Sequence, residues 1–481
     1  MENPSSERWS RAGIDDNMLA MFDASEVKDA HQDALDDRFA FLDAVRASSI
    51  VPEHGKPPTS EIFGAVFHML RTGKSLELIV GSYKLLVDLD KHFPRVYLSG
   101  TDDSHSSSNS PSKLVVVKEA WSPIVDCLDN ATAVSGAGDK QSGGPLDPSV
   151  RWFLLYSIFS YCSFHLLIED LAQILSETKF QAASMEPLRN MLLFQYLVIV
   201  FEDDFLPRNA TLNWSKQRES LLSLLLGSRK INYKILMKDC MAIICQLSHL
   251  LQSELSNHLE PQESSESKLS KNCHAALSLA LLGVLKDTCV SMEKLFVMIM
   301  DLDMARKKAD IEGFTTRADS PRTPLMDIIL DELAYNKDTV PVFLKIFSEP
   351  KWKLEIVVQY LWKYITKPSV RTRKSNDYTG DPTFSGALKC FSNKTGTKSL
   401  IKKIGVDVVQ FLLAHGFQAQ LSILSKGNAG GKQGRVNALV DLCQTFISAF
   451  HSLRSTDEHM EILSIGKEAL FTAANIISLK S

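Results

Sequence analysis

The sequence predicts an all-α protein, built as an irregular helical solenoid of the armadillo or HEAT type. Apolar residues recur every three or four positions in nearly every ordered segment, which places them on one face of a helix. Strands that alternate apolar and polar residues are absent, and the best strand candidate, Leu114–Val117, is short. No repeat with the period of about 40 to 47 residues that such solenoids show is visible. The repeats would therefore be degenerate, and an irregular all-α domain is the alternative.

Apolar stripes predict helices in chain order, within residues 35–45, 79–90, 354–364 and 436–450. Several helix starts are also visible. Pro57–Ser60 precedes a helix with Glu61 in its first turn, where an acidic side chain complements the helix dipole. Thr323 is expected to cap a helix whose first residue is Pro324, and Pro350 is expected to open another helix.

Stretches rich in Ser, Gly, Pro or charged residues predict loops at Thr101–Ser112, Asn130–Ser149 and Pro261–Lys271. The chain length allows two to four domains or one long solenoid. The expected division is an N-terminal helical segment with an acidic start (1–100), flexible Ser/Gly-rich loops around one short ordered segment (101–150), a central solenoid (151–366), a basic loop region (367–396) and C-terminal helices (397–481).

One apolar run could be mistaken for a membrane span. Trp152–Ile168 has no formal charge, but its length is at the lower limit for crossing a bilayer. It contains three serines and His165, and Glu169 follows at once. A buried helix of the solenoid is therefore the preferred interpretation, and no membrane attachment is expected.

The sequence shows no motif for catalysis, phosphate binding or metal binding. The scattered cysteines form no paired framework, which indicates a reducing compartment, and the polar start Met1–Arg11 predicts no signal peptide. Gly427–Gly434 lacks the strand and the Ser or Thr that a phosphate-binding loop needs. Cys240, Cys245 and His249 share a helix, but their spacing favours packing over metal binding. We expect no enzyme, no catalytic, metal-binding or cofactor-binding residue, no cofactor and no small-molecule substrate.

The charge is distributed unevenly. Residues 15–43 contain nine acidic and two basic residues, a net of −7, whereas residues 351–403 contain twelve basic and three acidic residues, a net of +9. The second region suits DNA phosphates or an acidic protein partner. A solvated helix face is the alternative for its cations, and its aromatic residues are expected in the core because they fall at helical spacing. The candidate contact residues are Lys351, Lys353, Arg371, Arg373, Lys374, Lys398, Lys402 and Lys403.

Two short patterns suggest regulation. Residues 371–374 fit a short nuclear localisation signal. Ser320 and Thr323 each precede a proline and are candidates for proline-directed phosphorylation, with Arg317 and Arg322 nearby to attract a phosphate. The simpler interpretation, which we prefer, is that Thr323 only caps its helix.

Several long blocks carry a family resemblance, namely Ile50–Thr59, Arg229–Asp239, Val297–Asp310, Ser320–Leu333, Pro350–Arg373, Lys402–Gln410 and Glu461–Ala473. They are similar to the plant nuclear family of negative regulators of systemic acquired resistance. The resemblance runs from about Asn17 to the C-terminus. The loops at 101–112 and 130–149 are longer than the family pattern, and the stretch Leu155–Phe164 looks inserted.

The resemblance implies an armadillo-like scaffold without enzymatic activity, located in the nucleus. It implies repression of pathogenesis-related genes, and hence contact with transcription factors or chromatin at defence promoters. It also implies membership of a structural-maintenance-of-chromosomes complex that acts in DNA repair by homologous recombination, with subunits of that complex as partners. Direct, sequence-nonspecific DNA binding through residues 351–403 is the alternative, because no recognition motif for specific bases is present.

Overall fold

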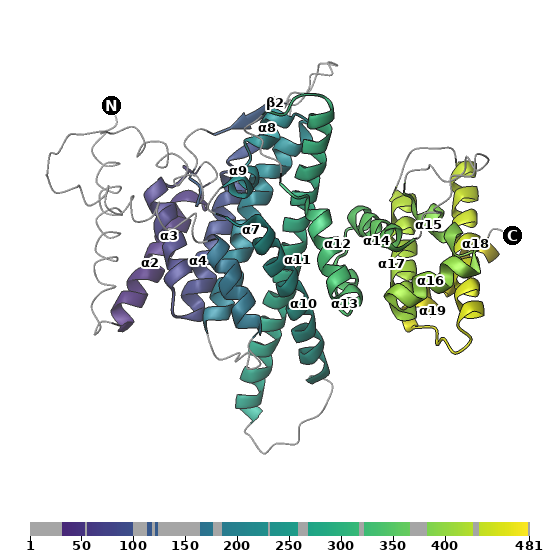
Figure 1. Cartoon of the computed structure of the whole chain (residues 1–481). Helices are drawn as coiled ribbons and strands as arrows, with labels where there is room; N and C mark the ends of the chain where they lie inside the picture. The colour runs from purple at the N-terminus through teal and green to yellow at the C-terminus, as the bar shows by residue number, and fades with distance from the viewer. Residues whose placement is uncertain are drawn as a thin grey trace. The chain divides into compact units, whose positions relative to one another are not determined.

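The structure is a computed structural model that describes residues 31–52, 55–99, 113–117, 121–123, 164–176, 185–228, 231–257, 268–316, 322–365, 382–426 and 432–479 (Figure 1). Almost all of these residues are helical, which confirms the all-α fold class; the solenoid character stays a prediction. The chain divides into two compact units, unit 1 (Met1–Arg322) and unit 2 (Thr323–Ser481). This boundary lies inside the segment 151–366 that was expected to form the central solenoid.

Unit 1 contains the helices α2 (His31–Ser49), α3 (Ser60–Thr72), α4 (Leu76–His92), α7 (Met185–Ala210), α8 (Trp214–Arg218), α9 (Leu221–Gly227), α10 (Tyr233–Asn257) and α11 (Lys268–Ile311), and a helix over 164–176. The predicted start of α3 is confirmed, because the Thr59 hydroxyl accepts a hydrogen bond from the amide of Ile62. Ser75 caps α4 in the same way. Since α11 begins at Lys268, the predicted loop Pro261–Lys271 is wrong at its end: a helix already occupies its last residues.

The strands among the described residues form one short antiparallel pair. Strand β1 (Val96–Ser99) pairs with β2 (Lys113–Val116), and Tyr97 lies opposite Val115. The strand expected at Leu114–Val117 is therefore confirmed to within one residue. The sequence did not predict β1, because a strand of four residues is too short to show alternation.

Helix α7 is the centre of unit 1, packed between α4 and α11 (Figure 1). Its residues Met191–Val198 are buried without interruption, as expected for a helix that neighbours cover on all sides. One polar side chain in this run, Gln195, is fully engaged. Its amide donates to the Val284 carbonyl (3.1 Å) and the Thr288 hydroxyl (2.9 Å), and its oxygen accepts from the Tyr83 hydroxyl (3.3 Å).

A buried charge cluster lies near the C-terminal end of α7. The Asp204 carboxylate, 1% exposed, is 3.3 Å from Nε of Arg208 and 3.6 Å from Nε of Arg95. Its second oxygen accepts the amide of Leu221 at 2.7 Å. The cluster therefore links α7, α9 and the start of β1 through one anion.

Unit 2 contains α12 (Leu325–Tyr335), α13 (Thr339–Ile346), α14 (Pro350–Tyr364), α15 (Phe384–Cys390), α16 (Lys394–Ile404), α17 (Val406–Lys426), α18 (Lys432–Thr456) and α19 (Ser464–Ser478). Helix α17 packs against α13, α14, α16, α18 and α19 and forms the core of the unit (Figure 1). Gly416 allows the Phe384 ring of α15 to lie close to the backbone of α17, because a Cβ at this position would lie 2.4 Å from the ring. The rings of Phe417 and Phe446 stack at 4.2 Å.

Two expectations for unit 2 need correction. The range 367–396 was expected to be a basic loop, but it includes α15 and the first turn of α16. Thr323 was expected to cap α12 with Pro324 inside the helix. Instead Pro324 is the cap residue, with extended dihedral angles (φ −56°, ψ 146°), and no side chain caps the helix. Pro350, by contrast, opens α14 as predicted.

Helix α17 is long and apolar enough to cross a membrane by length and composition alone. It is half buried by its neighbours, and the core helix of a globular unit passes the same test. The run Trp152–Ile168 lies outside the described residues except for its last part. There, Phe164, Leu167 and Ile168 are buried in unit 1, which agrees with the predicted core helix for those residues.

A candidate basic interface in unit 2

The predicted contact residues fall into two groups. Lys351 and Lys353 lie on α14, and Lys398, Lys402 and Lys403 lie on α16. Arg371, Arg373 and Lys374 lie outside the described residues, as does the nuclear localisation pattern that they form. Where the chain is described, the predicted contact residues therefore lie on two helices of unit 2, α14 and α16.

Two of the four aromatic residues of α14, Trp352 and Tyr360, are core residues, as their spacing predicted. Trp352 is 8% exposed and Tyr360 is fully buried, with its hydroxyl donating to the Leu333 carbonyl at 3.3 Å. Lys351 lies outside with its Nζ 4.4 Å from the centre of the Trp352 ring, in a cation–π contact. Trp352 and Tyr360 therefore stabilise the fold, whereas Trp362 and Tyr364 are half-buried.

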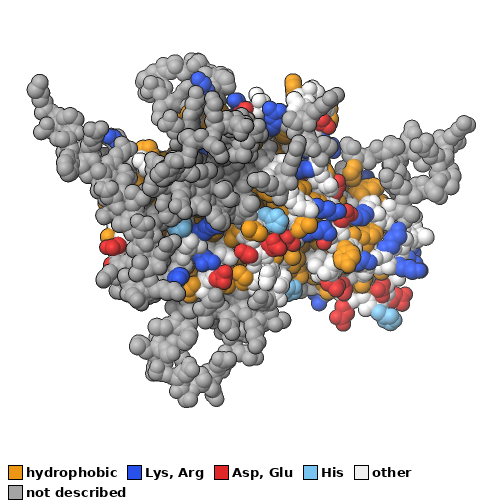
Figure 2. All heavy atoms as spheres, turned by 60° about the vertical axis from the view of Figure 1, so that its left-hand side comes forward, with side chains coloured by type: hydrophobic (Ala, Val, Ile, Leu, Met, Phe, Trp, Pro, Cys, Tyr) orange, Lys and Arg blue, Asp and Glu red, His pale blue; other side chains and the backbone are white. Residues whose placement is uncertain are grey.

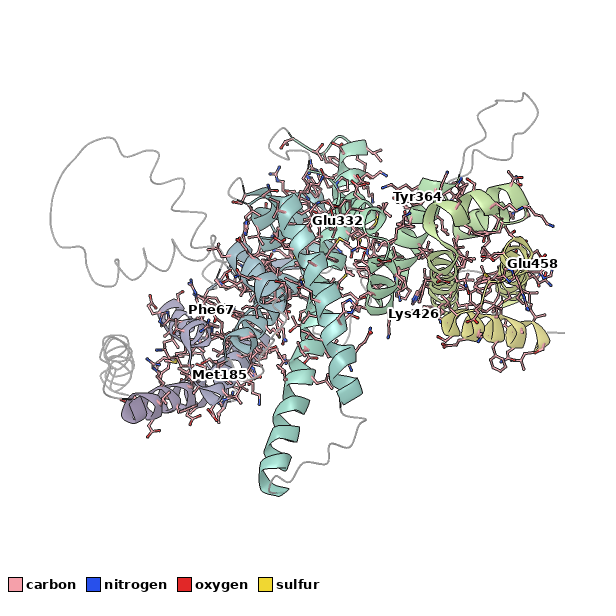
Figure 3. All side chains as sticks on the ribbon, turned by 60° about the horizontal axis from the view of Figure 1, so that its bottom comes forward. Phe67, Met185, Glu332, Tyr364, Lys426 and Glu458 are labelled. Atoms are coloured by element: carbon pink, nitrogen blue, oxygen red, sulfur yellow. The ribbon has the colours of Figure 1, made fainter. Side chains whose placement is uncertain are left out.

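Lys403 has a structural role. Its Nζ donates to the carbonyl of Tyr364, the last residue of α14 (labelled in Figure 3), at 3.2 Å. Its own carbonyl accepts a hydrogen bond from Nζ of Lys337. Both lysines thus bond carbonyls at the C-terminal ends of helices, where a positive charge is favourable. Lys403 is a weaker candidate for partner contact than the sequence suggested.

Lys353 is partly buried beside α17, where it faces His415. His415 is 5% exposed and its ring stacks on Phe411. Burial, with a smaller effect of the Lys353 charge, lowers the pKa of His415 to about 4. The histidine is therefore neutral at physiological pH, and the ammonium beside it is part of the packing of α14 on α17.

The exposed face of α16 carries a lysine ladder, formed by Lys394, Lys398 and Lys402. The three residues are four positions apart, so they share one face, and all are exposed. The opposite face buries Thr397, Leu400 and Ile404. Successive lysines lie about 6 Å apart along the helix axis. The predicted contact residues Lys398 and Lys402 are thus joined by Lys394, which the four-residue spacing could have identified.

The lysine ladder is not neutralised locally. Helix α16 contains no acidic residue, and no ion pair among the described residues includes a ladder lysine. Like charges four positions apart destabilise a helix by about 0.2 to 0.5 kcal/mol per pair. Elsewhere the described surface mixes both signs, as Figure 2 shows on the face that it draws. An uncompensated row of cations is the arrangement that binds a polyanion or an acidic protein surface.

The other candidates for chemistry are the cysteines and the two phosphorylation residues. No group of three or more His, Cys, Asp or Glu residues that could hold a metal occurs among the described residues. Burial raises the pKa of Cys240, and it raises the pKa of Cys245 to about 11. Both thiols therefore stay protonated at neutral pH, which suits packing rather than nucleophilic attack. Of the two phosphorylation candidates, Ser320 lies outside the described residues and Thr323 is exposed.

Comparison with known proteins agrees with the sequence resemblance. A model of the SNI1 middle domain matches residues 95–349, and a model of the SNI1 C-terminal domain matches residues 365–481. The chain is 40% identical over 474 residues to the negative regulator of systemic acquired resistance SNI1 of Arabidopsis thaliana, covering 97% of this chain and 95% of that protein. No solved structure matches the chain. With both domain models matched and a relative aligned over nearly its whole length, the chain belongs to the SNI1 family.

Proposed function

We propose that this protein is a non-enzymatic nuclear adaptor that represses defence gene expression in plants. The observation that carries the proposal is the 40% identity to a negative regulator of systemic acquired resistance over nearly all of both chains. The buried thiols and the neutral, buried His415 are consistent with a scaffold, because none of them is poised for catalysis. The adaptor would act at defence promoters through transcription factors or chromatin proteins.

Complementation tests the repressor role directly. In a plant that lacks its own SNI1, expression of this chain should lower the transcripts of pathogenesis-related genes in uninfected leaves. A measurement by quantitative PCR is sufficient. Transcripts that stay high, although the protein accumulates, would show that this chain is not a repressor.

We further propose that the adaptor serves in a structural-maintenance-of-chromosomes complex for DNA repair by homologous recombination. The lysine ladder supports a docking role, since an exposed row of cations fits an acidic protein surface. Tagged protein purified from plant nuclei should bring down subunits of that complex, identified by mass spectrometry. If only unrelated proteins copurify, the complex membership is wrong.

The contribution of the ladder can be separated from net charge. A variant with Lys394, Lys398 and Lys402 replaced by Glu should lose partner binding, because reversed charges repel the same surface. The matched control replaces three exposed lysines on other helices, Lys345, Lys426 and Lys467, which changes the net charge equally. Equal loss in both variants would mean that overall charge, and not the ladder, determines binding.

A second candidate function is direct, sequence-nonspecific binding to DNA. The ladder favours it because lysines about 6 Å apart along a helix can follow successive phosphates of one strand. With three phosphate contacts, the logarithm of the binding constant should fall with the logarithm of salt concentration with a slope of about −3. Fluorescence anisotropy with a labelled duplex measures this slope. A slope that is unchanged in the ladder variant would exclude α16 as the DNA contact.

A further inference from the structure

Thr323 differs from an ordinary helix-capping threonine. It precedes the cap residue Pro324 of α12, its side chain is exposed, and no side chain caps the helix. Its hydroxyl makes no hydrogen bond to the residues that the structure describes. The capping role that the sequence suggested for Thr323 is therefore absent, and the hydroxyl remains available for reaction.

The backbone that follows Thr323 has the form that a proline-directed kinase requires. Pro324 is extended (φ −56°, ψ 146°), close to the polyproline conformation, and a residue before proline is itself biased toward extended angles. A kinase binds its substrate as an extended strand across the active site, with the proline directly after the hydroxyl. The helix begins only at Leu325, so the Thr-Pro pair stays outside it.

The same chain contains an internal contrast. Ser122 also precedes a proline, but its side chain is only 2% exposed. The remaining Ser-Pro pairs, at Ser110 and Ser320, lie outside the described residues. Thr323 is thus the exposed Ser/Thr-Pro site among the described residues, and Ser122 is a buried site of the same sequence class.

We propose that Thr323 is a phosphorylation site for a proline-directed serine/threonine kinase. In the reaction the Thr323 Oγ attacks the γ-phosphorus of ATP and forms a new P–O bond. The bond to the bridging oxygen of ADP breaks, and the hydroxyl proton passes to the kinase's base. The product carries about two negative charges on the residue before Pro324.

The kinase step is tested on the full chain in a Ser110→Ala/Ser320→Ala background, which removes the two sites outside the described residues. A proline-directed kinase with labelled ATP should phosphorylate Thr323 and leave Ser122 unmodified, as mapped by mass spectrometry. Thr323→Ala should abolish the label. Short peptides around Ser122 and Thr323 serve as controls that the kinase accepts both sequences. A folded chain unlabelled at Thr323, although its peptide is a substrate, would overturn the proposal.

Discussion

Replacing Asp204 with alanine removes the anion at the centre of the charge cluster in unit 1. The carboxylate is 1% exposed, and it faces Arg208, with a side chain 4% exposed, and Arg95, 21% exposed. The substitution leaves one buried guanidinium without its main partner and removes the acceptor of the Leu221 amide. Water cannot replace these bonds fully at such low exposure.

The expected cost follows from this burial. Removing one partner of a buried ion pair costs about 3 to 5 kcal/mol. The lower end applies here, because Arg95 keeps some contact with water and Arg208 retains hydrogen-bond distance to the Lys216 carbonyl (3.3 Å). We therefore expect the free energy of unfolding of unit 1 to fall by about 3 kcal/mol in urea denaturation followed by circular dichroism.

A matched exposed pair in the same unit provides the control. Lys294 Nζ lies 2.7 Å from the Glu202 carboxylate, closer than either arginine lies to Asp204. The Lys294 and Glu202 side chains, however, are 46% and 24% exposed. Glu202→Ala should therefore cost only about 0 to 1 kcal/mol. If Asp204→Ala costs no more than Glu202→Ala, burial does not determine the strength of these pairs and the reasoning is refuted.

Three further predictions concern burial and space. Burial raises the pKa of Asp90 to about 7, so the folded state keeps a proton that the unfolded chain loses near pH 4, and stability falls as pH rises from 4 to 7. Asp90→Asn should therefore raise the melting temperature more at pH 8 than at pH 5. An equal gain at both pH values would contradict this. Gly416→Ala should destabilise unit 2 by about 1 to 3 kcal/mol, because its Cβ meets the Phe384 ring at 2.4 Å. Gly283→Ala should stabilise α11 by about 0.5 to 1 kcal/mol, because its new Cβ would meet no atom within 4 Å. Chemical denaturation measures both glycine variants, and changes in unfolding free energy of the same sign would contradict the difference in packing.

Local signals predicted what is decided locally. The cap at Thr59 and the helix that begins at Pro350 depend on residues within one turn, and both are present. The start of α12 was misplaced by one residue. Proline fixes its own φ at a helical value but leaves ψ free, and here ψ is extended, so the helix begins one residue later.

Tertiary features were harder to predict. Strand β1 exists because it pairs with β2, and no pattern within four residues shows such a partner. Helix α15 was not predicted either, because its seven residues lie in a basic stretch and are too few to show a clear apolar pattern. Among the candidate contacts, the structural role of Lys403 depends on the nearby end of α14, which residue type alone does not indicate.

The fully bonded Gln195 has a consequence for how unit 1 reaches one fold. Helix α7 is apolar along most of its length, and a uniformly apolar helix can slide by one turn against α11 with little loss of contact. In a shifted register, however, the Gln195 amide would lose Val284, Thr288 and Tyr83 together and remain buried without partners. Gln195 alone therefore raises the free energy of every shifted packing of α7 against α11. A Gln195→Leu protein should keep its helices but give broader, multiple signals in NMR spectra of the core methyl groups.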